Sequence, residues 1–140
     1  MILRALNEAL RTSKSETFVL PEQLTVEHLL PQEWEAHYPL PNDLPLNGEE
    51  TTEQRRQRLL HTVGNLTLLT GPLNTSISNG PFKDKAREIG NLSDLRLNAP
   101  FREREHSKWD EHDILSRGEV LLQTAKTLWP RPDASLTDDA

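Results

Sequence analysis

Glycine and proline interrupt the middle of this chain so often that only short regular segments fit between them. Residues 38–50 contain three prolines and a glycine, a composition that predicts an irregular loop. Gly-Pro pairs at residues 71–72 and 80–81 each predict the start of a short helix, because proline suits the first helical turn. The apolar segment 66–69 has room for only one short strand. These breaks exclude a large sheet.

Periodicity and capping residues predict the elements around these breaks. Apolar residues predict a short helix at residues 3–10, which lacks a capping residue at its start. Residues 51–54 have a capping-box pattern for a helix that should run to about His61, with Gly64 expected to end it. Asp110 is expected to cap a long last helix. Strands are expected at three places, residues 17–20, 24–26 and 66–69. The predicted class is α+β, mostly helical.

Length and composition bound the number of domains and the setting. The 140 residues fit one domain, which we place at residues 1–130, with an acidic flexible tail at residues 131–140. The uncapped first helix suggests that the domain is the C-terminal part of a longer protein. The chain has no cysteine, which excludes disulfides and cysteine-bound zinc. We find no signal peptide and no apolar run of membrane-spanning length, and expect a cytoplasmic setting.

Four polar residues have an order and spacing that suit the cleavage of phosphodiesters. Glu27 and His28 are adjacent, and Asn74 follows Asn65 by nine residues. Together they can supply a metal ligand, a proton acceptor, a positioning group and a second metal ligand. A histidine can take a proton from water near pH 7, and a divalent ion can stabilise the charge on the leaving oxygen. We therefore expect a nuclease that uses one Mg²⁺ or Mn²⁺ ion.

The motifs together resemble a known family. The segments EHLLPQ, GNLTLLTGPLN and SNGPFKDK, and a last helix that begins WDE and ends in WP, are similar to the C-terminal domain of GmrSD-type restriction endonucleases. That family is a branch of the His-Me finger (HNH) nucleases. The resemblance covers residues 24–129 and is specific as a set, whereas each part alone is weak. It implies a ββα-metal finger formed by a strand, a long loop, a second strand and a helix.

The resemblance also implies a role for each of the four residues. His28 would be the general base, and Glu27 would bind the metal from the first strand. Asn65 would complete the catalytic set by holding the loop that carries His28, and Asn74 would be the second metal ligand. Neighbouring residues of a strand point to opposite faces. Glu27 and His28 can therefore share a site only if the chain leaves strand geometry there.

Further residues are expected to bind DNA or to support the site. Lys83 and Lys85 are candidates for contact with DNA, although each could also be an ordinary surface charge. Asn79 is expected to cap the next helix, and Arg117 to pair with an acid and anchor the last helix. The other histidines have no partner at a recognisable spacing, and we expect surface or core roles for them (His37, His61, His106 and His112).

The net charge of −6 argues against tight binding of DNA by this chain alone, because nucleic-acid backbones are bound by Lys and Arg. Small basic clusters such as Arg55, Arg56 and Arg58 are expected to offset part of the repulsion. The resemblance implies a nucleotide-hydrolysing N-terminal domain or subunit that is absent from this chain and would bring it to DNA. Two alternatives stay open, a non-catalytic DNA-binding or assembly module and an RNase.

Overall fold

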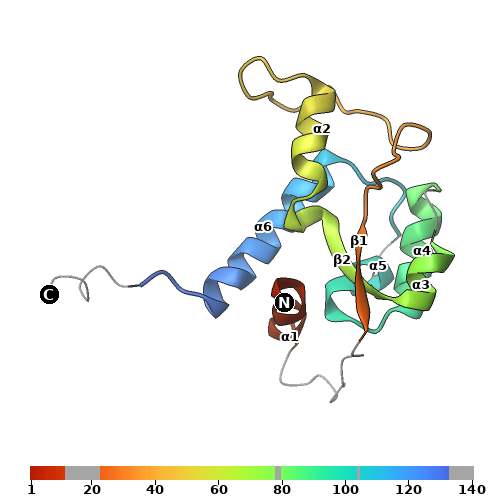
Figure 1. Ribbon diagram of the computed structural model, residues 1–140, viewed down its shortest axis with the longest axis vertical. Helices are drawn as coiled ribbons and strands as arrows, with labels where there is room; N and C mark the ends of the chain where they lie inside the picture. Colours follow the sequence, from red (N-terminus) through yellow and green to blue (C-terminus); the bar gives the residue numbers. More distant parts are fainter. Residues whose placement is uncertain (12–22, 78–79, 104, 133–140) are drawn as a thin grey trace, which may run out of the picture.

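Helices surround one two-stranded sheet in the described part of the chain (Figure 1). The structure is a computed structural model, which describes residues 1–11, 23–77, 80–103 and 105–132. In chain order the elements are α1 (Ile2–Ala9), β1 (Leu24–His28), α2 (Thr52–Leu60), the 3-10 turn η1 (Val63–Asn65), β2 (Leu66–Thr70), α3 (Gly71–Ser76), α4 (Phe82–Leu92), the 3-10 turn η2 (Arg96–Asn98), α5 (Pro100–Glu103) and α6 (Glu111–Leu128). The predicted α+β, mostly helical class is confirmed.

The two strands form an antiparallel pair at the centre of the molecule (Figure 1). Leu24 pairs with Thr70 at one end of the register and His28 pairs with Leu66 at the other. The connection between the strands is long and includes α2, and α3 begins directly after β2. The chain order is therefore strand, long connection, strand, helix, and His28 is the last residue of the first strand.

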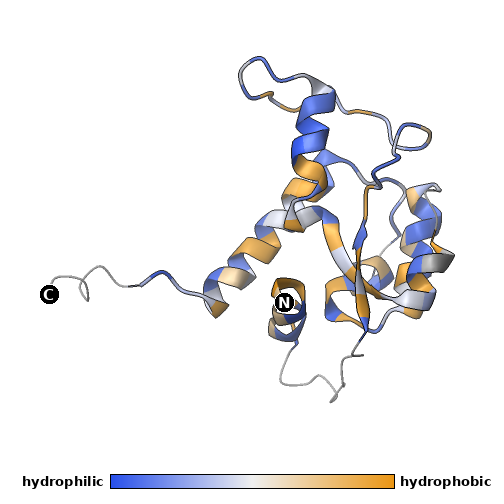
Figure 2. Ribbon diagram, in the orientation of Figure 1, coloured by the Kyte–Doolittle hydropathy of each residue, from blue (hydrophilic) through white to orange (hydrophobic). Residues whose placement is uncertain are grey.

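Two apolar clusters form the core, one on each side of the sheet. The larger joins the segment after β1 to α2, α3, α4 and α5, and its fully buried members include Leu29, Leu30 and Ile89. The smaller joins α1, β2 and α6, with Leu6 and Leu121 at its centre. Figure 2 shows apolar segments of α1, α6 and β2 close to one another. No helix among the described residues has the length and hydropathy to cross a bilayer.

The backbone of η1 packs directly against the backbone of α6. A Cβ atom added to Gly64 would lie 2.1 Å from the carbonyl oxygen of Ile114 and 3.0 Å from the backbone nitrogen of Gly118. Only glycine allows this approach. The prediction that Gly64 ends the preceding helix is therefore wrong, since α2 already ends at Leu60 and Gly64 serves the packing of η1 on α6.

The predicted caps of α2 and α6 are present. Thr51 and Gln54 form a capping box at α2, and Asp110 forms one at α6 through Asp113. On α6, Ile114 and Leu121 are buried and Ala125 is partly buried, whereas Leu128 at the far end is 39% exposed. The strand predicted at residues 17–20 lies outside the described residues.

Candidate active site

Glu27 and His28 line one surface cleft at the end of β1. The cleft has a volume of about 230 Å³, and Pro31, Gln32 and Glu33 form the rest of its lining. Strand pairing continues through His28, so the backbone leaves strand geometry only at the following residue. The turn of the chain after His28 brings the residues that follow it back beside the two side chains. An acid and an imidazole therefore meet at one solvent-accessible place.

Asn65 fixes the backbone that follows His28. Its side chain is fully buried. The amide nitrogen donates to the carbonyl oxygens of Leu30 (3.0 Å) and Leu60 (2.9 Å). The amide oxygen accepts from the backbone nitrogen of Leu30 (2.8 Å) and from Nε1 of Trp109 (3.1 Å). One side chain thus ties the segment after β1 to the end of α2 and to the start of α6.

The imidazole of His28 has a partner that the sequence did not indicate. Its Nε2 lies 2.9 Å from Nδ1 of His61, and the two rings meet edge to face with centroids 5.0 Å apart. Burial lowers the pKa of His28, and His61 and Lys85 lower it further, whereas Glu27 acts in the opposite direction. The expectation that His61 has no partner is wrong. His28 ends a strand and His61 follows a helix 33 residues later, and no sequence pattern predicts a contact between two such positions.

Lys85 is buried beneath the acid of the cleft. Its ammonium group donates to Oε1 of Glu27 (2.9 Å) and to the carbonyl oxygens of His28 (2.7 Å) and Leu29 (3.3 Å). Only 3% of Lys85 is exposed. Burial lowers its pKa, and Glu27 opposes that effect. The expectation that Lys85 contacts DNA is corrected, because its charge already binds three oxygens inside the domain. Lys83 is about half exposed and pairs with Glu105 at 3.4 Å.

Asn74 lies on α3 beside the first strand. Its amide nitrogen donates to Oγ1 of Thr25 at 2.8 Å. Thr25 and Glu27 are two residues apart on β1 and therefore share one face of the strand. Asn74 does not line the cleft itself. Among the described residues, no group of three or more His, Asp or Glu side chains is placed to hold a metal ion.

Arg117 supports the site from α6. Its Nη1 donates to the carbonyl oxygens of Val63 (3.1 Å), Gly64 (3.1 Å) and Leu66 (2.7 Å), on both sides of Asn65. Burial lowers the pKa of Arg117 to about 10. The expectation of an acidic partner is corrected, because these backbone carbonyls receive the guanidinium instead. Asn79, expected to cap α4, lies outside the described residues.

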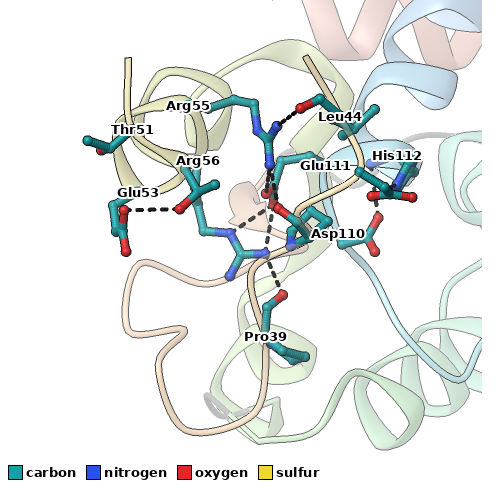
Figure 3. Close-up of polar contacts among 12 residues, drawn as sticks. Pro39, Leu44, Thr51, Glu53, Arg55, Arg56, Asp110, Glu111 and His112 are labelled. Carbon is teal, nitrogen blue, oxygen red and sulfur yellow. Dashed lines mark hydrogen bonds and ion pairs between the residues drawn. The ribbon is translucent and has the colours of Figure 1, made fainter. Parts of the chain in front are cut away.

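Two arginines expected at the surface are buried around Glu111 (Figure 3). Arg56 lies 2.7 Å from the carboxylate of Glu111, and Arg55 lies 3.8 Å from it. Both guanidinium groups also donate to backbone carbonyl oxygens of the proline-rich loop, as in the bond from Nη1 of Arg55 to Leu44 at 2.7 Å. These arginines hold the loop to α2 and α6, which corrects the expectation that they offset repulsion by DNA.

The comparisons with known proteins give one match. A family model described as "GmrSD restriction endonucleases, C-terminal domain" matches residues 1–124. Neither the curated proteins nor the solved structures gave a match.

Proposed function

Because this chain belongs to the family of C-terminal domains of GmrSD restriction endonucleases, we propose that it is a metal-dependent DNA endonuclease with His28 as general base. The observation that carries the proposal is the shared cleft of Glu27 and His28. An acid and an imidazole at one accessible place are what hydrolysis of a phosphodiester requires from the protein. Asn65 supports the arrangement, since it fixes the backbone on which the imidazole stands.

His28 would remove a proton from the attacking water. A pKa held below the ordinary histidine value keeps the imidazole neutral at pH 7, and a neutral imidazole can accept a proton. His28 is only partly buried, so part of the imidazole stays accessible to solvent. The imidazole is therefore already in the neutral form from which a general base acts.

Glu27 and Asn74 would hold a magnesium or manganese ion. Both offer oxygen atoms, which these hard cations prefer, and magnesium usually keeps several waters and takes only one or two protein ligands. Asn74 uses its nitrogen for Thr25, so its amide oxygen is the atom suited to a cation. Lys85 holds one oxygen of Glu27 and so fixes the orientation of the carboxylate. When bound, the ion would stabilise negative charge on the scissile phosphate and the leaving oxygen.

We place DNA binding largely outside this chain. The net charge is −6, and the burial of two arginines with Glu111 lowers the number of cations available to phosphates. Lys83 is the candidate contact that stays accessible. A nucleotide-hydrolysing N-terminal domain or subunit would supply recruitment and specificity, in a cytoplasmic restriction system that acts on foreign or modified DNA.

A nicking assay tests the proposal. Supercoiled plasmid incubated with the chain and Mg²⁺ or Mn²⁺ should be nicked slowly, and His28→Ala should reduce the rate by about 10²–10⁴-fold. His112→Ala is the matched control, because His112 is also an imidazole in a side-chain pair, with Asp43 at 2.8 Å, but lies on α6 away from the cleft. Equal rates for the His28 variant and wild type would refute the assignment.

The net acidity specifically favours one alternative, a non-catalytic assembly module. That reading expects no nicking by wild type, with or without the partner domain. Parallel incubation with RNA tests the other alternative, an RNase, because neither the DNA endonuclease nor the non-catalytic module is expected to cleave RNA.

A further inference from the structure

We propose that His61 is a positioning residue for the general base, which accepts a hydrogen bond from Nε2–H of His28 and thereby fixes the tautomer that can act. The inference rests on the proposed role of His28 and adds a residue to it. Its observation is the 2.9 Å separation between Nε2 of His28 and Nδ1 of His61. A catalytic base is commonly oriented by a third group in this way.

The two histidines are held in register by the same buried amide. Asn65 binds the carbonyl oxygen of Leu30, two residues after His28, and the carbonyl oxygen of Leu60, one residue before His61. Its oxygen also binds the backbone nitrogen of Leu30. The end of β1 and the end of α2 are therefore clamped at one point. Because both backbone segments are fixed there, the two imidazoles are brought next to each other by the placement of the backbone.

The direction of the hydrogen bond decides whether His28 can act as a base. A neutral imidazole carries one N–H and one lone pair. If Nε2 of His28 donates to His61, the lone pair of His28 is on Nδ1 and can take a proton from water. If Nδ1 of His61 donates instead, the lone pair of His28 on Nε2 is already used. His61 must therefore be neutral, with its own proton on Nε2.

Three neighbouring groups act on the imidazole of His28. Glu27 lies next to His28 on β1, Lys85 reaches the same backbone from α4, and His61 follows the last residue of α2. The ammonium of Lys85 and the carboxylate of Glu27 bind each other, so their effects on the imidazole largely oppose. His61 is the partner in direct contact with the ring, and it is the group whose replacement should change the behaviour of His28 most.

Nitrogen-15 NMR of the labelled full chain tests the tautomer without reference to cleavage. We expect His28 in the Nε2–H form and His61 with its proton on Nε2 at pH 7.5. An Nδ1–H form of His28 would overturn the proposal, as would a pair of rings that titrate independently. His61→Asp should raise the pKa of His28, because a carboxylate stabilises the imidazolium. His112→Leu should leave the His28 resonances unchanged.

The nicking assay then separates positioning from bulk structure. His61→Leu should lower the rate by about 3–10-fold, the factor expected for one hydrogen bond. His61→Asn should keep most of the rate, because Oδ1 of asparagine occupies nearly the position of Nδ1 and can accept the same bond. His61→Asp should shift the acidic limb of the pH–rate profile to higher pH. Equal rates and equal pH profiles in all three variants would overturn the positioning role.

The two proposals fail in different ways. If His28→Ala still nicks DNA, the general-base assignment is wrong, whatever the tautomers are. If His28→Ala is inactive while the NMR spectra show the Nδ1–H form of His28, only the role of His61 is wrong. His61 is exposed at the end of α2, so its variants are expected to fold, and the spectrum of the wild-type chain gives the tautomer in any case.

Discussion

Replacing Glu111 by glutamine should destabilise the domain more than any other change of a single charge that we consider. Its carboxylate is fully buried and lies 2.7 Å from Arg56 and 3.8 Å from Arg55, which are 1% and 2% exposed. Glutamine keeps the shape and removes the charge, so two guanidinium groups stay buried without an anion. Breaking a buried pair in this way costs about 3–5 kcal/mol.

The magnitude is large compared with the stability of a domain of this size, which is typically about 5–15 kcal/mol. At about 2–4 °C per kcal/mol, the melting temperature of Glu111→Gln should fall by about 6–20 °C. Urea denaturation followed by circular dichroism gives the free energy of unfolding, and an unchanged slope shows that the two-state comparison holds.

The control is Glu50→Gln. Glu50 also binds an arginine from α2, with 2.9 Å between its Oε2 and Nε of Arg58, but that arginine is 44% exposed and solvent screens the pair. The urea midpoint of Glu50→Gln should stay near that of wild type. If the two variants lose the same small amount of stability, the buried cluster does not hold the loop, and our account of Arg55 and Arg56 is refuted.

Three further outcomes are expected. Gly64→Ala should cost at least about 2 kcal/mol in urea denaturation because its Cβ meets backbone of α6, whereas Gly118→Ala, with nothing nearer than 3.7 Å, should be tolerated; similar values for both would contradict the close approach. Arg117→Ala should cost about 2–3 kcal/mol through three lost hydrogen bonds and lower the nicking rate, and an unchanged melting temperature would assign it a surface role. Removal of divalent ions with EDTA should stop nicking, and Glu27→Ala and Asn74→Ala should each raise the Mg²⁺ concentration needed; cleavage in EDTA at the original rate would exclude the ion from the reaction.

The local signals in the sequence predicted the elements well, because their causes are local. The capping box at Thr51 and the cap at Asp110 each involve partners within three residues, and both are present. The Gly-Pro pair that begins α3 likewise acts on its own first turn. Short-range hydrogen bonds and fixed proline geometry do not depend on the rest of the molecule, so they can be read without it.

The contacts that complete the cleft and hold the proline-rich loop could not be predicted, because each joins residues that are distant in the sequence. Lys85 meets Glu27 across 58 residues, and Arg56 meets Glu111 across 55. A lysine or an arginine looks the same in the sequence whether its side chain is exposed or buried, and only tertiary packing decides between the two positions. For the same reason His61, 33 residues from His28, gave no signal, although its helix was predicted almost to the residue.

The hydrogen bonds of Asn65 make the geometry of the cleft a property of the whole fold. They join segments 35 and 44 residues away in the chain, so they can form only after two long loops have closed. Local opening of the end of β1 alone would break the two hydrogen bonds of this buried amide to Leu30, which is costly. The amide proton of Leu30 should therefore exchange with solvent only on global unfolding. The cleft therefore forms cooperatively with the rest of the fold, and a partly folded chain would lack it.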